Sequence, residues 1–415
     1  MSTTLAPLGE PERYEALDLL RGFAVLGILL MNIQSFAMPF AAYFNPTALG
    51  PPAALDYAIW SVKHLLADQK FMTIFSLLFG AGVLLMSRRV AEHGGRPAVV
   101  HYRRMAWLLL FGLAHGYLLW YGDILVLYAV CGALIFPLRR LAPRTRLALG
   151  VASLAIGTAL NLVAGLSMPW WPPEDVAEIS AFWAPDAARL AREIAAYQGG
   201  WLAQMPHRTE VTFEFHAFQL WFWGLWRAAG LMLIGMALLD WKVPTGERTP
   251  AFHTKLAAAG FGLGLPLVAA GLWMNQAGGW TLHAFFTGGV WNYWGSVLVS
   301  LGWIGLVLRL WQAGTLPRLS RRLIAAGRMA FTCYILETLI CTSLFYGHGL
   351  GLFGTVDRLG QVAVVLGVWI VLLLFAPWWL ARYRMGPLEW LWRTLTYGSA
   401  GPIRRGAGQP GPVAA

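Results

Sequence analysis

Apolar runs of about twenty residues, each long enough to cross a membrane as a helix, recur along nearly the whole chain. Of its 415 residues, 58% are hydrophobic and only 12% are charged, about half the charge that a soluble protein carries. This shortfall is explained if lipid rather than water surrounds most of the surface. The sequence therefore predicts an all-α polytopic membrane protein, with the lipid bilayer as its main partner.

The apolar runs predict ten transmembrane helices. Their approximate limits are residues 17–38, 69–88, 103–121, 123–141, 147–168, 215–239, 254–275, 291–312, 324–346 and 360–382. The third and fourth runs meet at Tyr121, Gly122 and Asp123, which predicts a helical hairpin with a tight turn. We expect residues 1–16 to precede the membrane domain, residues 17–398 to form it, and the Gly- and Pro-rich residues 399–415 to be a disordered tail.

The distribution of basic residues predicts the orientation. With ten spans, 24 of the 31 Lys and Arg residues fall on one side, Arg227 lies within a run, and six fall on the other side: Lys63, Lys70, Arg189, Arg192, Arg208 and Arg358. Because cytoplasmic loops carry the excess of Lys and Arg, both termini are expected in the cytoplasm. Glu10, Glu12 and Glu15 precede the first run where a signal peptide would have cations, so no cleaved signal is expected. The net charge of +11 is then an insertion signal, which argues against a nucleic-acid partner.

Three segments between the spans have a distinct composition. Residues 39–68 contain a possible interfacial helix, in which His64 and Asp68 share one face. These two side chains are either a polar face at the lipid headgroups or a functional pair. Residues 169–214 are rich in Trp and Pro and are expected to form an external cap. Residues 276–290 are glycine-flanked and too short to span, which predicts a re-entrant or interfacial piece.

Ionisable and amide side chains near or within the first hairpins are the candidate site residues. Asp18 and Arg21 either pair at the end of the first span, or Arg21 binds the phosphates of a cytosolic donor. Asn32 lies further along the same span, where it is either a donor-site residue or interhelical hydrogen-bonding glue. His115 is either a core histidine or a general base, and Asp123 is either its partner or the cap of the following helix.

Two further charges lie inside predicted spans. Arg227 costs about 2.5–3.5 kcal/mol near a helix centre, so it needs a partner, and Glu337 is the acid predicted to pair with it. Gly80 and Gly82 predict a close helix–helix approach in the second span. Neither a metal-ligand cluster nor an internal repeat is found, and the cysteines are expected to be reduced packing residues: Cys131, Cys333 and Cys341.

Several segments together resemble the YeiB-like family of bacterial inner-membrane proteins. They are LDLLRGFAVLGILLMNIQSF, KFMTIFSLLFGAG, RRMAWLLLFGLAHGYLLWYGDILVLYA, GRMAFTCYILETLICTSLFYGHGLG and GPLEWLWRTLTYG, in this order from residue 17 to 398. The resemblance implies a multi-pass protein of the bacterial inner membrane. The first-span LDLLRG is also distantly similar to transmembrane acyltransferases, among them heparan-glucosaminide acetyltransferases and acyltransferase-three proteins, which implies an acyltransferase-like helical bundle.

This second resemblance has one departure. Acyltransferase-three proteins typically show an Arg, ten residues and then a catalytic His in the first span, whereas here Arg21 is followed at that spacing by Asn32. An amide cannot take a proton from a hydroxyl, so another residue would have to be the base, with His115 as the first candidate. The leading hypothesis is acyl transfer from a cytosolic donor bound near Arg21 to an acceptor that enters from the outer face near His115 and Asp123.

Other functions remain open at this point. No bound cofactor is expected, acyl-CoA is a possible substrate, and the acceptor is an unspecified small molecule, lipid or glycan. The competing class is a transporter or transport-associated protein, in which Arg227, His115 and Glu337 line a polar path. A third possibility is a lipid-binding or scaffold protein without turnover.

Overall fold

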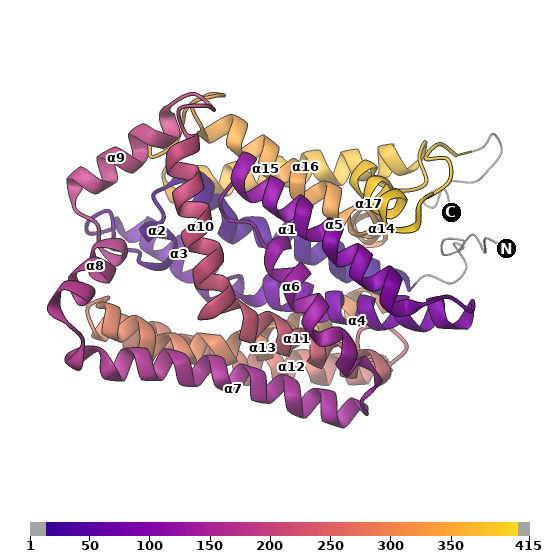
Figure 1. Ribbon diagram of the computed structural model, residues 1–415. Coiled ribbons are helices and arrows are strands. Elements are labelled where there is room, and N and C mark those ends of the chain that lie inside the picture. Colours follow the sequence, from indigo (N-terminus) through magenta and orange to yellow (C-terminus); the bar gives the residue numbers. More distant parts are fainter. Residues whose placement is uncertain (1–13, 406–415) are drawn as a thin grey trace.

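The computed structural model describes residues 14–405, which form a helical bundle with one isolated bridge between Tyr383 and Arg404 and no named strand (Figure 1). The α-helices are α1 Glu15–Ala37, α2 Ala41–Phe44, α3 Ala54–Leu66, α4 Lys70–Glu92, α5 Pro97–Leu118, α6 Leu125–Ile135, α7 Pro143–Ser167, α8 Pro173–Trp183, α9 Ala187–Gln198, α10 Met205–Trp221, α11 Gly224–Asp240, α12 Pro250–Ala277, α13 Leu282–Gln312, α14 Pro317–Arg328, α15 Ala330–Phe345, α16 Arg358–Leu380 and α17 Pro387–Tyr397. The 3-10 helices are η2 Phe136–Arg140 and η3 Met168–Trp170.

The bundle is built for a lipid environment. In the described chain, six helical segments are long and apolar enough to cross a membrane, or eight if the bent pairs α10–α11 and α14–α15 each count as one span. The apolar windows of α7, α12 and α16 are only 22%, 22% and 28% buried, so most of their apolar side chains face outwards. Water would not tolerate this much exposed apolar surface. The chain is therefore an all-helical membrane protein.

The predicted helices are present, but the count of ten spans is not confirmed. Each predicted run coincides with helical structure, and the hairpin of α5 and α6 packs as expected. However, neither α5 nor α6 is among the helices that meet the length and apolarity requirement, and α6 has only 11 residues. Residues 119–124 separate the two helices, so their connection is longer than the predicted tight turn.

Two other segments differ from, or refine, the sequence prediction. Residues 276–290 do not form a re-entrant piece, because α13 already begins at Leu282 and continues unbroken to Gln312. The Thr281 hydroxyl accepts the Ala284 N–H at 3.2 Å and so caps the first turn of α13. Residues 169–214 form the end of η3, then α8, α9 and the start of α10, at one end of the bundle in Figure 1.

The central helix is α1, whose apolar window is 72% buried. Glycines allow its neighbours to approach closely: a Cβ atom on Gly22 would lie 1.9 Å from the Leu323 carbonyl oxygen of α14. In the same way, a Cβ atom on Gly80 of α4 would lie 2.0 Å from the Met232 carbonyl oxygen of α11. Gly82 has no such neighbour, because its nearest atom is Arg21 Nη2 at 3.5 Å. The close approach predicted in the second span is therefore made by Gly80 alone.

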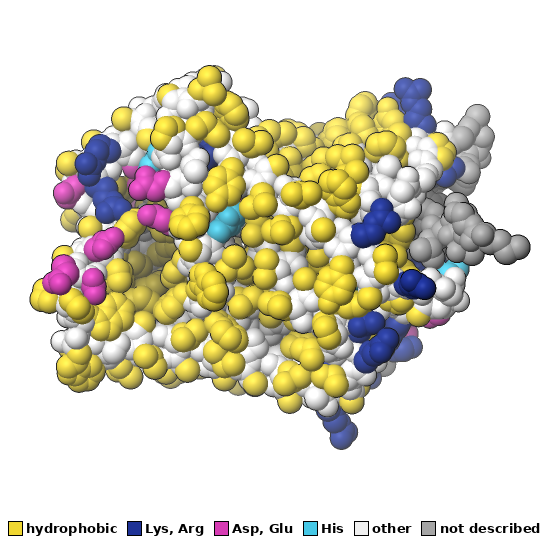
Figure 2. Space-filling view, in the orientation of Figure 1, with side chains coloured by type: hydrophobic (Ala, Val, Ile, Leu, Met, Phe, Trp, Pro, Cys, Tyr) yellow, Lys and Arg dark blue, Asp and Glu magenta, His cyan; other side chains and the backbone are white. Residues whose placement is uncertain are grey.

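The two ends of the bundle carry different charges. Figure 2 shows dark blue Lys and Arg side chains along the end where α17 and the connections next to α4 and α5 lie, whereas at the other end magenta Asp and Glu side chains over α8 and α9 lie among a few dark blue ones. The start of α1 belongs to the arginine-rich end, because Tyr14 and Leu17 line the same cavity as Arg393 of α17. This asymmetry matches the basic excess predicted for one side of the membrane.

Candidate functional site

Two cavities lie one after the other along α1. The first, here called the basic cavity, measures about 670 Å³ and is lined by α1 residues from Leu17 to Ile28. The second, here called the aromatic cavity, measures about 180 Å³ and is lined by α1 residues from Ile28 to Ser35. Ile28 lines both cavities, so they lie on adjacent stretches of α1 and this side chain stands between them.

The basic cavity combines a charged mouth with an apolar interior. Six arginines line it: Arg21, Arg88, Arg89, Arg104, Arg328 and Arg393. Arg21 Nη1 donates to Asp18 Oδ1 at 2.8 Å, which confirms the predicted pair. Arg104 is stacked on Trp392, with its guanidinium carbon 4.6 Å from the ring centroid. The deeper wall is apolar and includes Phe75, Leu78, Phe79, Leu108 and Leu125.

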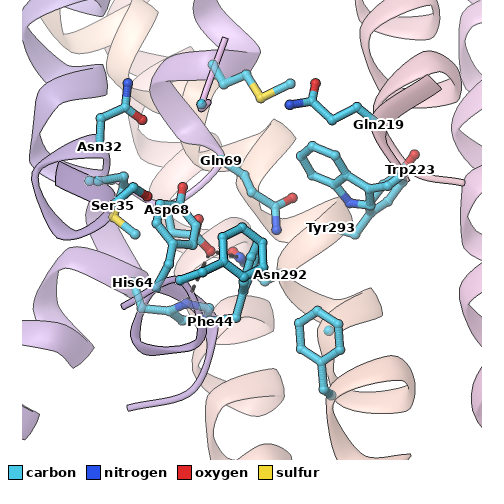
Figure 3. Close-up of a pocket in the computed structure, with 18 of the residues that line it drawn as sticks. Asn32, Ser35, Phe44, His64, Asp68, Gln69, Gln219, Trp223, Asn292 and Tyr293 are labelled. Carbon is cyan, nitrogen blue, oxygen red and sulfur yellow. Dashed lines mark hydrogen bonds and ion pairs between the residues drawn. The ribbon is translucent and has the colours of Figure 1, made fainter. Parts of the chain in front are cut away.

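The aromatic cavity contains a histidine–aspartate pair. His64 Nδ1 lies 3.2 Å from Asp68 Oδ2, and both side chains line the cavity (Figure 3). Asn292 Nδ2 donates to the same Asp68 oxygen at 2.7 Å, and its Oδ1 accepts from Lys70 Nζ at 2.7 Å. The Lys70 ammonium also donates to the His64 carbonyl oxygen at 2.6 Å. These contacts hold the carboxylate and the imidazole in one orientation.

One ring nitrogen of His64, Nε2, is free to accept a proton. A carboxylate can only accept, so a neutral His64 must carry its hydrogen on Nδ1 and present Nε2 as an acceptor. His64 Nε2 makes no hydrogen bond within residues 14–405. The ring is also stacked on Trp60, with centroids 5.0 Å apart, which fixes its plane. This arrangement is suited to a general base.

A break between α3 and α4 brings the pair into the cavity. Residues 67–69 interrupt the two helices, and Gln69 adopts a left-handed backbone conformation with φ of 64°. This conformation is uncommon for a residue with a Cβ atom and concentrates at functional sites. The sequence prediction that 39–68 is an interfacial segment did not reveal this geometry, because the turn at Gln69 has no glycine to signal it.

The structure also brings His115 and Asp123 together, but inside the protein. His115 Nδ1 lies 2.8 Å from Asp123 Oδ1, and His115 Nε2 lies 2.9 Å from Thr338 Oγ1. Asp123 Oδ2 accepts the Val126 N–H at 2.8 Å, so it caps the following helix as well as holding the histidine. The His115 side chain is 1% exposed, and neither residue lines either cavity. The catalytic role predicted for His115 stays a prediction.

The predicted bridge between Arg227 and Glu337 is wrong. Arg227 donates to the Tyr293 carbonyl oxygen, Thr73 Oγ1 and Ser296 Oγ at 2.7–2.9 Å. Glu337 is 2% exposed, and its Oε1 has no hydrogen-bond partner in the described chain. Neutral oxygens of two other helices, α4 and α13, replace the acid, because both helices reach Arg227 of α11 at this level. Sequence spacing gave no indication of this neighbour.

The remaining predicted residues are distributed over the two cavities. Arg21 and Asp18 line the basic cavity, whereas Asn32 lines the aromatic cavity, so the expected donor-site trio is divided. The cysteines are buried and free, as predicted: Cys131, Cys333 and Cys341. Within residues 14–405 no cluster of three His, Cys, Asp or Glu side chains is placed to hold a metal ion. Sequence reasoning missed several residues of the aromatic cavity whose only signal is a polar side chain in an apolar run: Gln219, Asn275 and Asn292.

Comparisons with known proteins show the family. Residues 238–399 match the model described as "Protein of unknown function (DUF418)". The chain is 35% identical over 398 residues to "Uncharacterized protein YeiB" of Escherichia coli K12, with 94% of this chain and 98% of that protein covered. It is 28% identical over 419 residues to "Uncharacterized protein YxaH" of Bacillus subtilis 168, with 97% and 99% covered. No solved structure matches. The chain that carries the basic cavity and the His64–Asp68 pair therefore belongs to the YeiB family of membrane proteins.

Proposed function

We propose that this protein transfers an acyl group from a cytosolic thioester donor in the basic cavity to a hydroxyl or amine in the aromatic cavity. The observation that carries the proposal is the placement of the two cavities on adjacent stretches of α1, with the Ile28 side chain lining both. One cavity is suited to an anionic amphiphile and the other presents a histidine base. The proposal requires one orientation in the membrane. The arginine-rich end, with both termini, lies in the cytoplasm and the α8–α9 end lies outside, as the excess of basic residues at one end predicts.

The donor side follows from the lining of the basic cavity. Guanidinium groups bind phosphate oxygens through paired, charge-assisted hydrogen bonds. Arg104 is well placed for this, because the Trp392 ring orients it and no hydrogen bond to residues 14–405 occupies its donors. Below the arginines, the apolar wall offers a path for an acyl chain. Acyl-CoA carries phosphates and an acyl thioester on one molecule, and a volume of about 670 Å³ is in the range of ligand sites.

The chemical step uses the free nitrogen of His64. The acceptor oxygen or nitrogen attacks the thioester carbonyl carbon while His64 Nε2 takes its proton. The C–S bond then breaks, and the departing thiolate receives that proton from the imidazolium. The products are an ester or amide and a free thiol, so no other reactant is needed. Asp68 keeps the imidazole in the required tautomer and stabilises its positive charge.

Asn32 gains a role that differs from the predicted donor contact. It lines the aromatic cavity, and its amide makes no hydrogen bond to the described chain. Asn32 lies one helical turn from Ile28, which lines both cavities. An amide N–H at this place can donate to the oxyanion that forms when the thioester is attacked. Such a donor would explain an amide at the position where the similar acyltransferases carry their histidine.

The proposal is tested by measuring the release of free thiol from acyl-CoA by the purified protein in nanodiscs. We expect free CoA to accumulate from acetyl-CoA or longer acyl-CoA when an extract of outer-surface small molecules and glycans is supplied. His64→Gln should abolish the release. His283→Gln should not, because His283 lies on α13 outside both cavities, where its ring is hydrogen-bonded to the Gly165 carbonyl oxygen. Absence of both binding and release with every chain length would overturn the proposal.

Transport is the second candidate, and the same observation favours it. Two cavities that approach each other from opposite ends of a bundle also describe a path interrupted at Ile28. The two functions differ in the fate of the donor. Transport moves an unchanged solute into proteoliposomes, whereas acyl transfer leaves a free thiol on the side of addition.

A further inference from the structure

We propose that the exposed first half of α14 binds an anionic phospholipid of the membrane leaflet at the arginine-rich end of the bundle. The inference goes beyond the proposed function and does not depend on it. It is drawn from the orientation and depth of α14, from two arginines on its surface, and from the exposed leucines beside them.

The orientation of α14 comes first. The chain bends by 89° between α14 and α15, and α15 runs along the bundle, so α14 lies across it (Figure 1). A Cβ atom on Gly327 would lie 1.8 Å from the Asp18 carbonyl oxygen, which means that α14 crosses α1 at its first turn. Because α1 begins at the arginine-rich end, α14 lies flat against that end of the bundle.

The depth of this crossing can be compared with that of α16. Trp369 Nε1 of α16 donates to the Leu26 carbonyl oxygen of α1 at 2.8 Å, so these two residues lie at the same level. The two helices are antiparallel, because the start of α16 also bonds to the last part of α1. Eight residues separate Leu26 from Asp18, and nine separate Trp369 from Trp378, which corresponds to about 12 and about 14 Å of helix. The crossing of α14 over α1 and the Trp378 side chain therefore lie at similar depth.

Trp378 indicates where the lipid headgroups begin. Its side chain is 50% exposed, and the Arg382 guanidinium carbon lies 4.7 Å from its ring centroid. An exposed Trp at the end of an apolar helix, followed by an Arg, is typical of the boundary between hydrocarbon and headgroups. Since α14 crosses at this depth, its surface lies among the headgroups.

The exposed surface of α14 combines charge with apolar side chains. Arg318 and Arg322 are exposed and four residues apart, so they share one side of the helix. Neither makes a hydrogen bond or an ion pair within residues 14–405. Leu316 and Leu319 beside them are 51% and 40% exposed. Two guanidinium groups next to apolar side chains are complementary to a phosphate that carries acyl chains.

The leucines distinguish a lipid from a soluble polyanion. A nucleic acid would contact the arginines and leave Leu316 and Leu319 in water, whereas a phospholipid covers both kinds of side chain. The bound lipid would also hold α14 against α1. This contact matters for the basic cavity, because Gly327 and Arg328 at the other end of α14 line it.

The test measures lipid binding to the purified protein by native mass spectrometry, with phosphatidylglycerol and phosphatidylcholine of the same acyl chains. We expect phosphatidylglycerol to bind at least tenfold more tightly. The double variant Arg318→Gln/Arg322→Gln should lose about tenfold or more of this affinity, since each basic side chain at an anionic surface contributes roughly fivefold. The matched control is Arg140→Gln/Arg144→Gln, which removes two arginines that are exposed in another connection at the same end, outside the basic cavity.

A second variant tests the apolar part of the surface. Leu319→Ser keeps both arginines and should weaken phosphatidylglycerol about threefold, while binding of a single-stranded oligonucleotide stays unchanged. All substituted side chains are exposed, so the melting temperatures in phosphatidylcholine should equal that of the wild type. Equal binding of the two lipids, or equal losses in the two double variants, overturns the inference. So does an oligonucleotide that binds as tightly as phosphatidylglycerol and depends on the same arginines, because α14 would then be a surface for soluble polyanions.

Discussion

Arg21 and Asn32 lie on the same helix but open into different cavities. They are eleven residues apart, which corresponds to about 16 Å along an α-helix. A pantetheine-like arm is an extended chain of comparable length, so phosphates held near Arg21 are compatible with a thioester near Asn32. Because the predicted donor site is divided between two cavities, the proposed donor would have to be extended rather than compact to contact both residues.

Replacement of the two candidate bases distinguishes them. His64→Gln should lower the rate of thiol release about a hundredfold to ten-thousandfold, because a positioned base is lost, with unchanged yield and melting temperature. His115→Gln should leave the rate within a few fold and lower the melting temperature, since His115 bonds both Asp123 and Thr338. A large rate loss in His115→Gln with intact stability would return the base to His115.

Neutralising the mouth of the basic cavity should weaken donor binding. Arg104→Gln removes a guanidinium held over Trp392, and acyl-CoA should then bind about tenfold or more weakly, because a hydrogen bond to a charged group contributes about 1.5–3 kcal/mol. The difference should shrink at high salt. Arg96→Gln is the control, since Arg96 is exposed and does not line the cavity. Equal losses in both variants would indicate nonspecific attraction only.

The fold was largely predictable from the sequence because lipid imposes length and apolarity on each helix. The positions at which helices break or bend were not predictable. Gln69, between α3 and α4, carries no local turn signal, and the bends at Phe222–Trp223 and Met329 fall within apolar runs. Backbone departures of this kind are stabilised by neighbouring helices, and one sequence does not state which helices are neighbours.

The site was predictable only in part, for the same reason. Local pairs such as Asp18–Arg21 and His64–Asp68 follow from helical spacing and are present. Contacts between distant segments do not: Asn292 reaches Asp68 from α13, and Arg227 finds carbonyl and hydroxyl oxygens rather than an acid. Any buried acceptor can satisfy an arginine, so charge matching alone selected the wrong partner.

The corrected surroundings of Arg227 predict how its substitutions combine. Arg227→Leu should lower the free energy of unfolding by at least about 2 kcal/mol, because several hydrogen bonds to a charged donor are lost. Addition of Glu337→Leu should change this value by no more than its own single effect, within about 0.5 kcal/mol, since the two residues share no partner. Denaturant titrations of the four proteins in micelles measure this cycle. A double variant that regains stability would restore the Arg227–Glu337 bridge.

Two glycines of α4 provide a matched pair for helix packing. Gly80→Ala places a methyl group 2.0 Å from the Met232 carbonyl oxygen, so α4 and α11 must separate, at a cost of about 1–3 kcal/mol. Gly82→Ala meets only Arg21 Nη2 at 3.5 Å, and its better helix propensity should leave stability equal or up to about 1 kcal/mol higher. Thermal unfolding in one detergent compares them. Similar melting temperatures would show that the α4–α11 contact is looser than described.

The last prediction concerns pH and the α8–α9 end of the bundle. Glu193 of α9 accepts the Phe40 N–H at 2.8 Å, and burial raises the pKa of its carboxyl above the usual 4.5 despite that bond. The unfolded chain therefore loses this proton first as pH rises, so stability is lost from about pH 4.5 up through the raised pKa. Glu193→Gln keeps an acceptor but cannot titrate, so its melting temperature relative to wild type should rise between pH 4 and pH 7. Glu178→Gln, at an exposed position on α8, should show no such trend. Phe40 lines the aromatic cavity, so this bond ties α9 to one wall of that cavity. If the difference in melting temperature between Glu193→Gln and wild type stays constant across this pH range, α9 does not hold that wall through a buried carboxyl.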